Sequence, residues 1–165
     1  MDPGRIALTH GPGVDTRRFS PQPEPEGTPV VILPARLLWD KGVGEFVQAA
    51  RLLRGEGIRA RFVLGGYMDP GNPSAIPVDQ LEAWEKEGLV ERWSWQDDIT
   101  ALIAQANIIC LPSYREGMPR TLLEASASGR AIIASDVPGC RDVVRDGENG
   151  LLVPVRDSSA LAKAI

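Results

Sequence analysis

The sequence holds few of the residues that build metal centres and disulfide frameworks. It contains one histidine and two cysteines among 165 residues. Neither Cys110 nor Cys140 stands at a metal-ligand spacing from another cysteine or a histidine, so no metal site is predicted. We expect a cytosolic pair of free thiols, with Cys110 in a buried strand and Cys140 in a loop. His10 lies in an early loop rich in glycine and proline, and we interpret it as a surface residue rather than a base.

The chain also lacks an excess of positive charge and a long apolar run. Its formal net charge is −4, which argues against a general nucleic-acid binder. No apolar run approaches the roughly 18 residues that span a membrane, and no apolar region follows Met1-Asp2-Pro3-Gly4 as in a signal peptide. No Gly-x-Gly-x-x-Gly follows a strand and no Gly-x-x-x-x-Gly-Lys-Ser/Thr occurs, which disfavours nicotinamide cofactors and P-loop hydrolysis.

Short β-branched runs alternate with helical stretches along most of the chain. The expected strands are residues 5–9, 28–35, 59–65, 90–93, 108–111, 131–135 and 150–153. The expected helices are residues 41–56, 77–87, 99–104, 119–128 and 158–165, the last with Asp157 as its cap. Strands apolar enough to be buried on both faces, with helices between them, predict a parallel sheet. The expected fold is therefore a doubly wound, Rossmann-like α/β domain that binds ligands at the carboxyl ends of its strands.

At both ends of the sequence the expected secondary-structure elements are cut short. The first expected strand starts almost at once, and the last helix stops after about two turns, against the ~11–12 residues of a typical helix. We therefore expect residues 1–165 to be one domain excised from a longer protein.

The loop after the strand at residues 28–35 carries two cations, Arg36 and Lys41. An arginine can chelate a phosphate and a lysine can act as a point charge, so this loop predicts an anion site at the sheet edge. The alternative is that both are solvated loop charges or form salt bridges to Asp40.

Two carboxylates, Glu116 and Glu124, stand eight residues apart around the start of a predicted helix. The backbone amides from Gly117 to Thr121 are largely the unpaired donors of that helix start, and Pro119 is expected at its first position. Such an end attracts a phosphate, and flanking carboxylates suit hydroxyl groups, so a sugar nucleotide is predicted. The alternative is that Glu116 is an ordinary loop carboxylate and Glu124 a helix-surface charge or a neighbour of Arg120.

Three further features leave their roles open. Gly65 and Gly66 end a strand, where they allow either a close backbone approach to a ligand or a mere tight turn. Trp39 lies between the two cations, whereas Trp93 and Trp95 are interpreted as packing or pocket walls. Residues 146–150 are expected to form a structural turn before the last strand.

Taken in order, these motifs resemble those of the C-terminal, donor-binding domain of retaining glycosyltransferases of family 4, which have the GT-B fold. The matching pieces are Gly13-Val-Asp15 with Phe19, Ala35-Arg-Leu-Leu-Trp-Asp-Lys-Gly42, Leu64-Gly-Gly66, Pro112-Ser-Tyr-Arg-Glu-Gly-Met-Pro119, Leu123-Glu-Ala125 with Gly129, Asp136-Val-Pro-Gly-Cys140 and Asp146-Gly-Glu-Asn-Gly-Leu-Leu-Val-Pro154. Their form is most similar to the branch that builds capsule, exopolysaccharide and lipid-linked oligosaccharide, often from N-acetylhexosamine donors.

The resemblance implies a role for each candidate residue. Glu116 matches the first glutamate of the family's Glu-x7-Glu motif, which approaches the donor hexose, and Glu124 matches the second, which binds the ribose. Arg36 and Lys41 match the basic pair that neutralises the diphosphate leaving group. Backbone N–H groups around Met118 to Leu122 would touch hexose and phosphate, and Pro119 and Thr121 lie within this substrate-binding stretch. Transfer would retain the anomeric configuration without a metal or cofactor, usually from a uridine diphosphate (UDP) sugar.

The resemblance also implies what this chain lacks. The N-terminal domain that contacts a glycan or lipid-linked acceptor is absent, as is the closing C-terminal helix, and membrane contact would come only through the missing domain. Many relatives carry a catalytic-site histidine in that N-terminal domain, and His10 of this chain is not expected to correspond to it. We expect a cytoplasmic protein whose isolated donor half binds donor weakly and transfers nothing. The alternatives are a sugar-nucleotide epimerase on the same fold and a non-catalytic sugar-nucleotide-binding module.

Overall fold

A computed structural model describes residues 11–93 and 98–165. These residues contribute six strands to one parallel sheet with the order β3-β2-β1-β4-β5-β6. The strands are β1 (Val30–Leu33), β2 (Arg61–Gly65), β3 (Glu91–Trp93), β4 (Ile108–Leu111), β5 (Ala131–Ser135) and β6 (Leu151–Val153). The expected doubly wound, Rossmann-like α/β fold is confirmed. The strand expected at residues 5–9, together with His10 and Trp95, lies outside the described residues.

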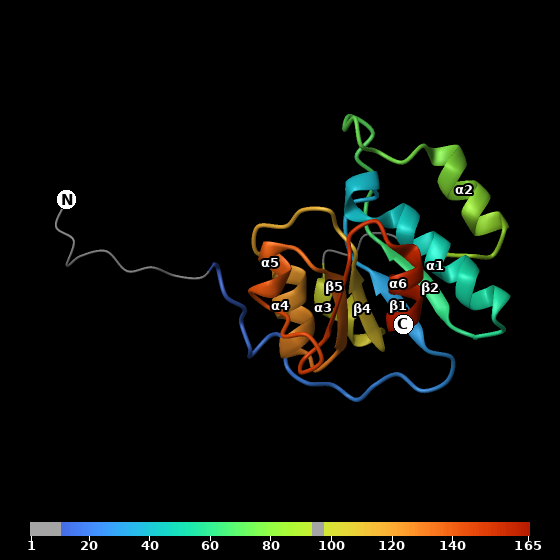
Figure 1. Cartoon of the computed structure of the whole chain (residues 1–165). Coiled ribbons are helices and arrows are strands. Elements are labelled where there is room, and N and C mark those ends of the chain that lie inside the picture. Colours follow the sequence, from blue (N-terminus) through green and yellow to red (C-terminus); the bar gives the residue numbers. More distant parts are fainter. Residues whose placement is uncertain (1–10, 94–97) are drawn as a thin grey trace, which may run out of the picture.

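Helices cover both faces of the sheet (Figure 1). One face packs against α1 (Val43–Gly55), α2 (Val78–Lys86) and α6 (Ser158–Ala164). The other face packs against α3 (Ile99–Ala104), α4 (Arg120–Ala127) and α5 (Pro138–Arg141). Successive strand residues point to opposite faces, so Val31 and Leu33 enter the first core and Val30 and Ile32 the second. This double burial explains why the strands are continuous apolar runs.

Three local expectations about helices differ from the structure in detail. The helix expected from about Lys41 is α1, which begins at Val43, because Gly42 has a left-handed backbone with φ of 72° and separates it from a 3₁₀ turn, η2 (Trp39–Lys41). Pro119 has an extended backbone and caps α4, which begins at Arg120. Cys140 lies in α5 rather than in a loop. The cap at Asp157 is confirmed, since its side chain accepts the Ala160 amide at 2.8 Å.

The strand order has a reversal point between β1 and β4. From β1 the chain winds outward to β2 and β3, then returns to pair β4 with the other side of β1. In such sheets the loops after the two central strands diverge and leave a crevice at the carboxyl edge. Here those loops are residues 34–42 and 112–119, which carry the basic pair and the first glutamate.

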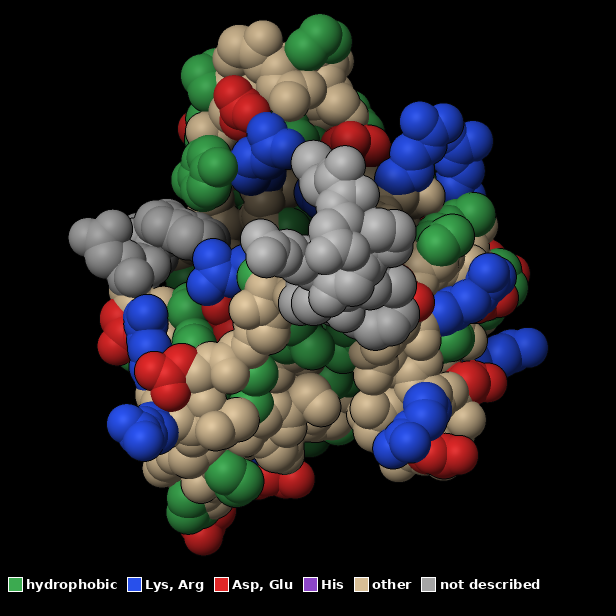
Figure 2. Space-filling view, turned by 90° about the vertical axis from the view of Figure 1, so that its left-hand side faces the viewer, with side chains coloured by type: hydrophobic (Ala, Val, Ile, Leu, Met, Phe, Trp, Pro, Cys, Tyr) green, Lys and Arg blue, Asp and Glu red, His purple; other side chains and the backbone are tan. Residues whose placement is uncertain are grey.

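The face of the molecule on the left-hand side of Figure 1 carries side chains of both signs of charge. Figure 2 shows Lys and Arg side chains interspersed with Asp and Glu over this face. Within the described part of the chain, no helix is long and apolar enough to cross a membrane.

Candidate functional site

The loops after β1 and β4, residues 34–42 and 112–119, meet through a short ion pair. Lys41 Nζ lies 2.7 Å from Glu116 Oε1, and the two side chains are only 20% and 13% exposed. A backbone hydrogen bond from the Tyr114 amide to the Asp40 carbonyl, at 2.9 Å, joins the same loops. The structure therefore brings together a cation and a carboxylate that the sequence places in the loops after two separate strands.

Two glycines allow the loops to approach this closely. A β-carbon on Gly42 would overlap the carbonyl oxygen of Pro112, at the root of the loop after β4. A β-carbon on Gly139, in α5, would overlap the carbonyl of Gly117 and lie 2.5 Å from that of Glu116. Glycine at both positions lets η2 and α5 pack backbone to backbone against the loop that carries Glu116.

Arg36, the second cation, pairs with a residue from a third loop. Its Nη1 donates to Asp69 Oδ2 at 2.9 Å, with the side chains 41% and 32% exposed. The suggested salt bridges to Asp40 are not formed, because Asp40 accepts the Ser74 hydroxyl at 3.1 Å and the cations have other partners. The basic pair thus consists of two cations that are each held by one carboxylate.

Glu124 lies on the inner side of α4 with only 7% of its surface exposed. Burial raises the pKa of its carboxyl group, while the positive charges of Arg120 and Arg18 act in the opposite direction. Its Oε1 lies 3.7 Å from Nη2 of Arg120, which is itself largely exposed. The interpretation as a helix-surface charge is therefore wrong, and the proximity to Arg120 is confirmed.

The start of α4 offers backbone donors to a ligand. The Leu122 amide bonds back to Pro119 O at 3.0 Å, and the amides of Arg120 and Thr121 before it have no acceptor within the helix. Pro119 makes no side-chain cap bond. Leu122 has a fully buried side chain, so only its backbone could contact a ligand. Gly117 and Met118 precede the cap, and Gly117 is exposed.

Gly65 and Gly66 are explained by contacts within the protein. A β-carbon on Gly66 would overlap the carbonyl oxygen of Ala35, and one on Gly65 would lie 2.9 Å from Leu102 Cδ2. Gly66 makes its close backbone approach to the loop that follows the neighbouring strand β1. Both glycines are therefore explained without a bound ligand.

A polar cluster behind the Glu116 loop was missed from the sequence. The Tyr114 hydroxyl donates to Glu45 Oε1 at 2.8 Å, and the Arg156 guanidinium lies 4.6 Å from the centre of the Tyr114 ring. These residues come from the β4–α4 loop, α1 and the β6–α6 connection. In the sequence, only the position of Tyr114 inside a motif pointed to this cluster. Glu45 and Arg156 come near Tyr114 only in the folded chain.

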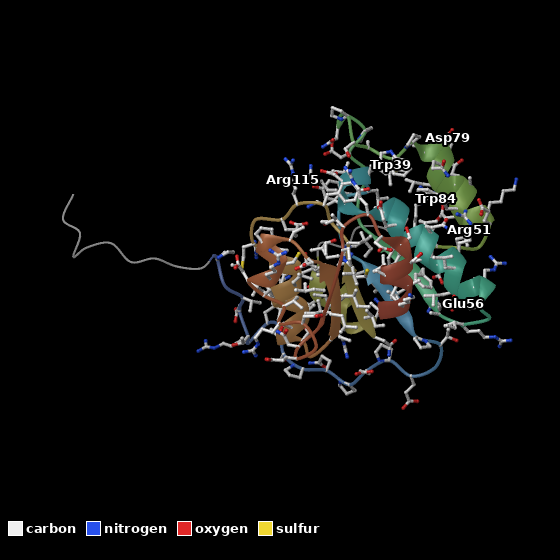
Figure 3. All side chains as sticks on the ribbon, in the orientation of Figure 1. Trp39, Arg51, Glu56, Asp79, Trp84 and Arg115 are labelled. Carbon is white, nitrogen blue, oxygen red and sulfur yellow. The ribbon has the colours of Figure 1, made fainter. Side chains whose placement is uncertain are left out.

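Aromatic residues lie at the same end of the molecule. Trp39 is 39% exposed and stacks edge-on against Trp84 of α2, with ring centres 5.9 Å apart. Figure 3 shows Trp39 and Arg115 at the upper end, where η2 and the loop after β4 emerge from the sheet. Trp93 instead donates its indole N–H to Glu91 and faces Arg61, so it serves packing.

Among the described residues, the cysteines and acidic side chains form no group suited to a metal ion. Cys110 and Cys140 are free and buried, which confirms the expected free thiols. Burial raises the pKa of the Cys140 thiol to about 12, with the nearby Glu116 carboxylate acting in the same direction. No group of three His, Cys, Asp or Glu side chains that could hold a metal occurs in residues 11–93 and 98–165.

Comparison with known proteins identifies the family. The model for the family described as "Glycosyl transferases group 1" matches residues 28–165. The chain belongs to the group 1 glycosyltransferases.

One relative of this group 1 chain is an N,N'-diacetylbacillosaminyl-diphospho-undecaprenol alpha-1,3-N-acetylgalactosaminyltransferase from Campylobacter jejuni. It is 37% identical over 137 residues, which cover 83% of this chain and 34% of the relative. The chain thus spans about a third of that enzyme's length.

Solved structures share the fold of this glycosyltransferase chain. The C-terminal domain of a group 1 glycosyltransferase, LpcC from Francisella tularensis, has a TM-score of 0.74 and 26% identity, covering 92% of this chain and 85% of that domain. Anabaena HepE in complex with UDP-glucose has a TM-score of 0.76 and 22% identity, covering 92% of this chain and 44% of HepE. The resemblance to GT-B glycosyltransferases is thereby confirmed.

Proposed function

We propose that this chain is the donor-binding domain of a glycosyltransferase that uses a nucleoside-diphosphate sugar. The observation that carries the proposal is the contact between Lys41 and Glu116 across the reversal point of the sheet. This contact supports the proposal because a cation suited to phosphate lies beside an acceptor suited to hydroxyl groups. Parallel sheets of this kind bind nucleotides at that place.

The diphosphate would lie against Arg36, Lys41 and the start of α4. The two cations and the unpaired helix amides all attract an anion. Their interaction with the diphosphate strengthens as negative charge develops on this leaving group. Lys41 has three ammonium hydrogens, so it can keep its bond to Glu116 and still donate to a phosphate oxygen. The chain's catalytic contribution is therefore stabilisation of the leaving group.

The two glutamates would bind different hydroxyl groups. Glu116 lies beside Lys41, where its carboxylate can accept hydrogen bonds from the donor hexose. Glu124 is buried further along α4, and a desolvated carboxylate gains most from ribose hydroxyls that supply the missing donors. The backbone N–H groups of Met118, Arg120 and Thr121 would bind hexose and phosphate oxygens, because Pro119 has no N–H and that of Leu122 already donates to the Pro119 carbonyl.

The rest of the reaction would depend on a second domain. This chain covers a minority of the length of its relative from Campylobacter jejuni, whose name describes a lipid-linked acceptor. A glycan or lipid-linked acceptor bound by an N-terminal domain, transfer with retention and a cytoplasmic location are the expectations that follow from the family. UDP is the proposed nucleotide, in line with the complex of the similarly folded HepE. The domain by itself is expected to bind donor and transfer nothing.

Calorimetric titration of this chain with UDP tests the assignment of the glutamates. Glu124→Ala should weaken UDP binding by about 1.5–3 kcal/mol, or roughly 10- to 150-fold, because a hydrogen bond to a charged group is lost. Glu116→Ala should leave UDP affinity equal or higher, since it frees Lys41, but should remove the added affinity of a UDP-hexose. Glu148→Ala, a carboxylate 66% exposed on a surface turn, is the control and should change neither value.

Undiminished UDP affinity in the Glu124 variant would overturn the ribose assignment. Failure of the wild-type chain to bind UDP or any other nucleoside diphosphate would overturn the proposed function as a whole.

A further inference from the structure

The ion pair between Arg36 and Asp69 uses only part of the arginine. Asp69 Oδ2 accepts from Nη1 at 2.9 Å, and the described residues offer this guanidinium no second acceptor. The Nε–H and Nη2–H groups, on another edge of the planar guanidinium group, can therefore donate to a ligand. An arginine anchored through one nitrogen can still present two parallel N–H groups to a phosphate.

Asp69 is held by its own segment. The Asn72 amide donates to the Asp69 carbonyl at 2.9 Å, and Asn72 Nδ2 lies 3.4 Å from the Asp69 carboxylate. The side chain of Asn72 in turn accepts the Ser74 amide at 2.9 Å. The carboxylate therefore stands on a closed turn, residues 69–74, which keeps it in one place.

The same turn is bonded to the loop that carries the basic pair. Ser74 accepts the Trp39 amide through its carbonyl at 2.8 Å and the Asp40 amide through its hydroxyl at 3.2 Å. Ile76 donates its amide to Leu37 O at 3.1 Å. Figure 1 shows this β2–α2 connection rising beside η2 at the top of the molecule. Residues 69–76 thus brace the Arg36 loop along its length.

The ion pair itself adds little to the stability of the fold. Both side chains are about a third exposed or more, and solvent screens such pairs. Its larger effect is on the arginine side chain, which has many rotamers when it is free and must lose that freedom when it binds a ligand. A carboxylate that restricts these rotamers beforehand reduces that loss.

We propose that Asp69 is a positioning residue, which holds the Arg36 guanidinium ready for the diphosphate of the donor. This inference rests on the proposed function of the crevice. Asp69 touches no substrate atom and acts through Arg36. Its negative charge also opposes the diphosphate, so a test must separate orientation from charge.

Two substitutions at Asp69 make that separation. Asp69→Asn and Asp69→Ala both remove the charge, but only asparagine keeps an oxygen that can accept from Nη1. Affinity for UDP, measured by calorimetry on this chain, should be about two- to tenfold weaker in Asp69→Ala than in Asp69→Asn. In an Arg36→Ala background the two variants should bind UDP equally, because the residue that Asp69 orients is gone. If Asp69→Ala does not fold, Asp69→Ser takes its place, since serine is too short to reach Nη1.

A second ion pair supplies the matched control. Arg51 Nη2 and Glu87 Oε2 are also 2.9 Å apart and similarly exposed, with Arg51 on α1 away from the crevice (Figure 3). Glu87→Ala and Glu87→Gln should bind UDP like the wild type.

Three results would overturn the inference. Equal UDP affinities in the alanine and asparagine variants, both tighter than wild type, would show that Asp69 acts only as a competing charge. A difference that persists without Arg36 would show a role independent of the arginine. Wild-type binding that is insensitive to Arg36→Ala would remove the site on which the inference rests, and would count against the proposed function itself.

Discussion

At Glu124, folding and the proposed ligand binding make opposite demands. The side chain is buried on α4, and burial raises the pKa of its carboxyl group despite the charges of Arg120 and Arg18. The folded state therefore holds the proton more tightly than the unfolded state does. A ribose-binding role would require the charged form, which folding disfavours. A residue with that role would serve ligand binding at some loss of stability.

Glu124→Gln should therefore raise the melting temperature at pH 7 while weakening UDP binding. An acid with a raised folded-state pKa loses stability as pH rises from its unfolded pKa, about 4.3 for glutamate, to its folded value. The difference in melting temperature between variant and wild type should thus be present at pH 7 and should disappear below about pH 4. Thermal unfolding monitored by circular dichroism across this range measures it. The exposed Glu148→Gln serves as control, and a Glu124→Gln variant less stable than wild type at pH 7 would contradict the account.

At the scale of elements, α5 shows how a very short helix can support a site. Its four residues, Pro138–Arg141, pack so closely on the loop after β4 that a side chain on Gly139 would overlap the carbonyl of Gly117. Cys140, on the same helix, lies buried near Glu116. The position of the Glu116 loop therefore depends on a helix that contributes no catalytic group.

Gly139→Ala should destabilise the domain by about 1–3 kcal/mol, because backbone atoms on both sides must move apart. Since that movement displaces Glu116 from Lys41, UDP-hexose binding should weaken as well. Gly55→Ala is the matched control: this helical glycine has open space at its β-carbon, and alanine there should be neutral or stabilising by up to about 1 kcal/mol. Urea unfolding and calorimetry measure both variants. Equal stability of Gly139→Ala and wild type would refute the packing argument.

The observed helices and strands show which structural features the sequence patterns could predict. The bounds of β4, β5 and α3 agree with the sequence prediction. Short apolar runs with paired isoleucines identify the two strands locally, and α3 begins at a capping aspartate, Asp98. The helix at Cys140 was missed because four residues are too few for a helical period to show. The break at Gly42 was missed because one left-handed glycine does not disturb the apolar pattern of α1.

The candidate residues of the site could be named from the sequence, but the contacts between them could not. The sequence indicated Arg36 and Lys41 because they follow the end of a strand, and it indicated Glu116 and Glu124 because they flank the start of a helix. It could not reveal that Lys41 and Glu116 pair, since they are 75 residues apart and meet only because β1 and β4 are neighbours. Asp69 was overlooked for the same reason, as its loop approaches Arg36 only in the folded sheet.

At the scale of the whole molecule, three loops from three strands converge at one edge of the sheet. They follow β1, β2 and β4, which are adjacent in the order β2-β1-β4. Ion pairs link the first loop to each of the others, through Asp69 and through Glu116. A ligand that bridges the loops would therefore stabilise the sheet at its centre, and one that touches a single loop would do so less.

UDP should consequently raise the melting temperature far more than its fragments do. At a UDP concentration of about 100 times Kd, linkage gives about 2.7 kcal/mol, which corresponds to roughly 5–10 °C for a domain of this size. Uridine and inorganic phosphate, each at the same concentration, should give much smaller shifts, because each reaches only part of the crevice. Lys41→Gln should abolish most of the UDP shift and leave the small uridine shift unchanged, since uridine carries no phosphate. Differential scanning fluorimetry of this chain makes the comparison, and equal shifts with uridine and UDP would rule out a diphosphate site between these loops.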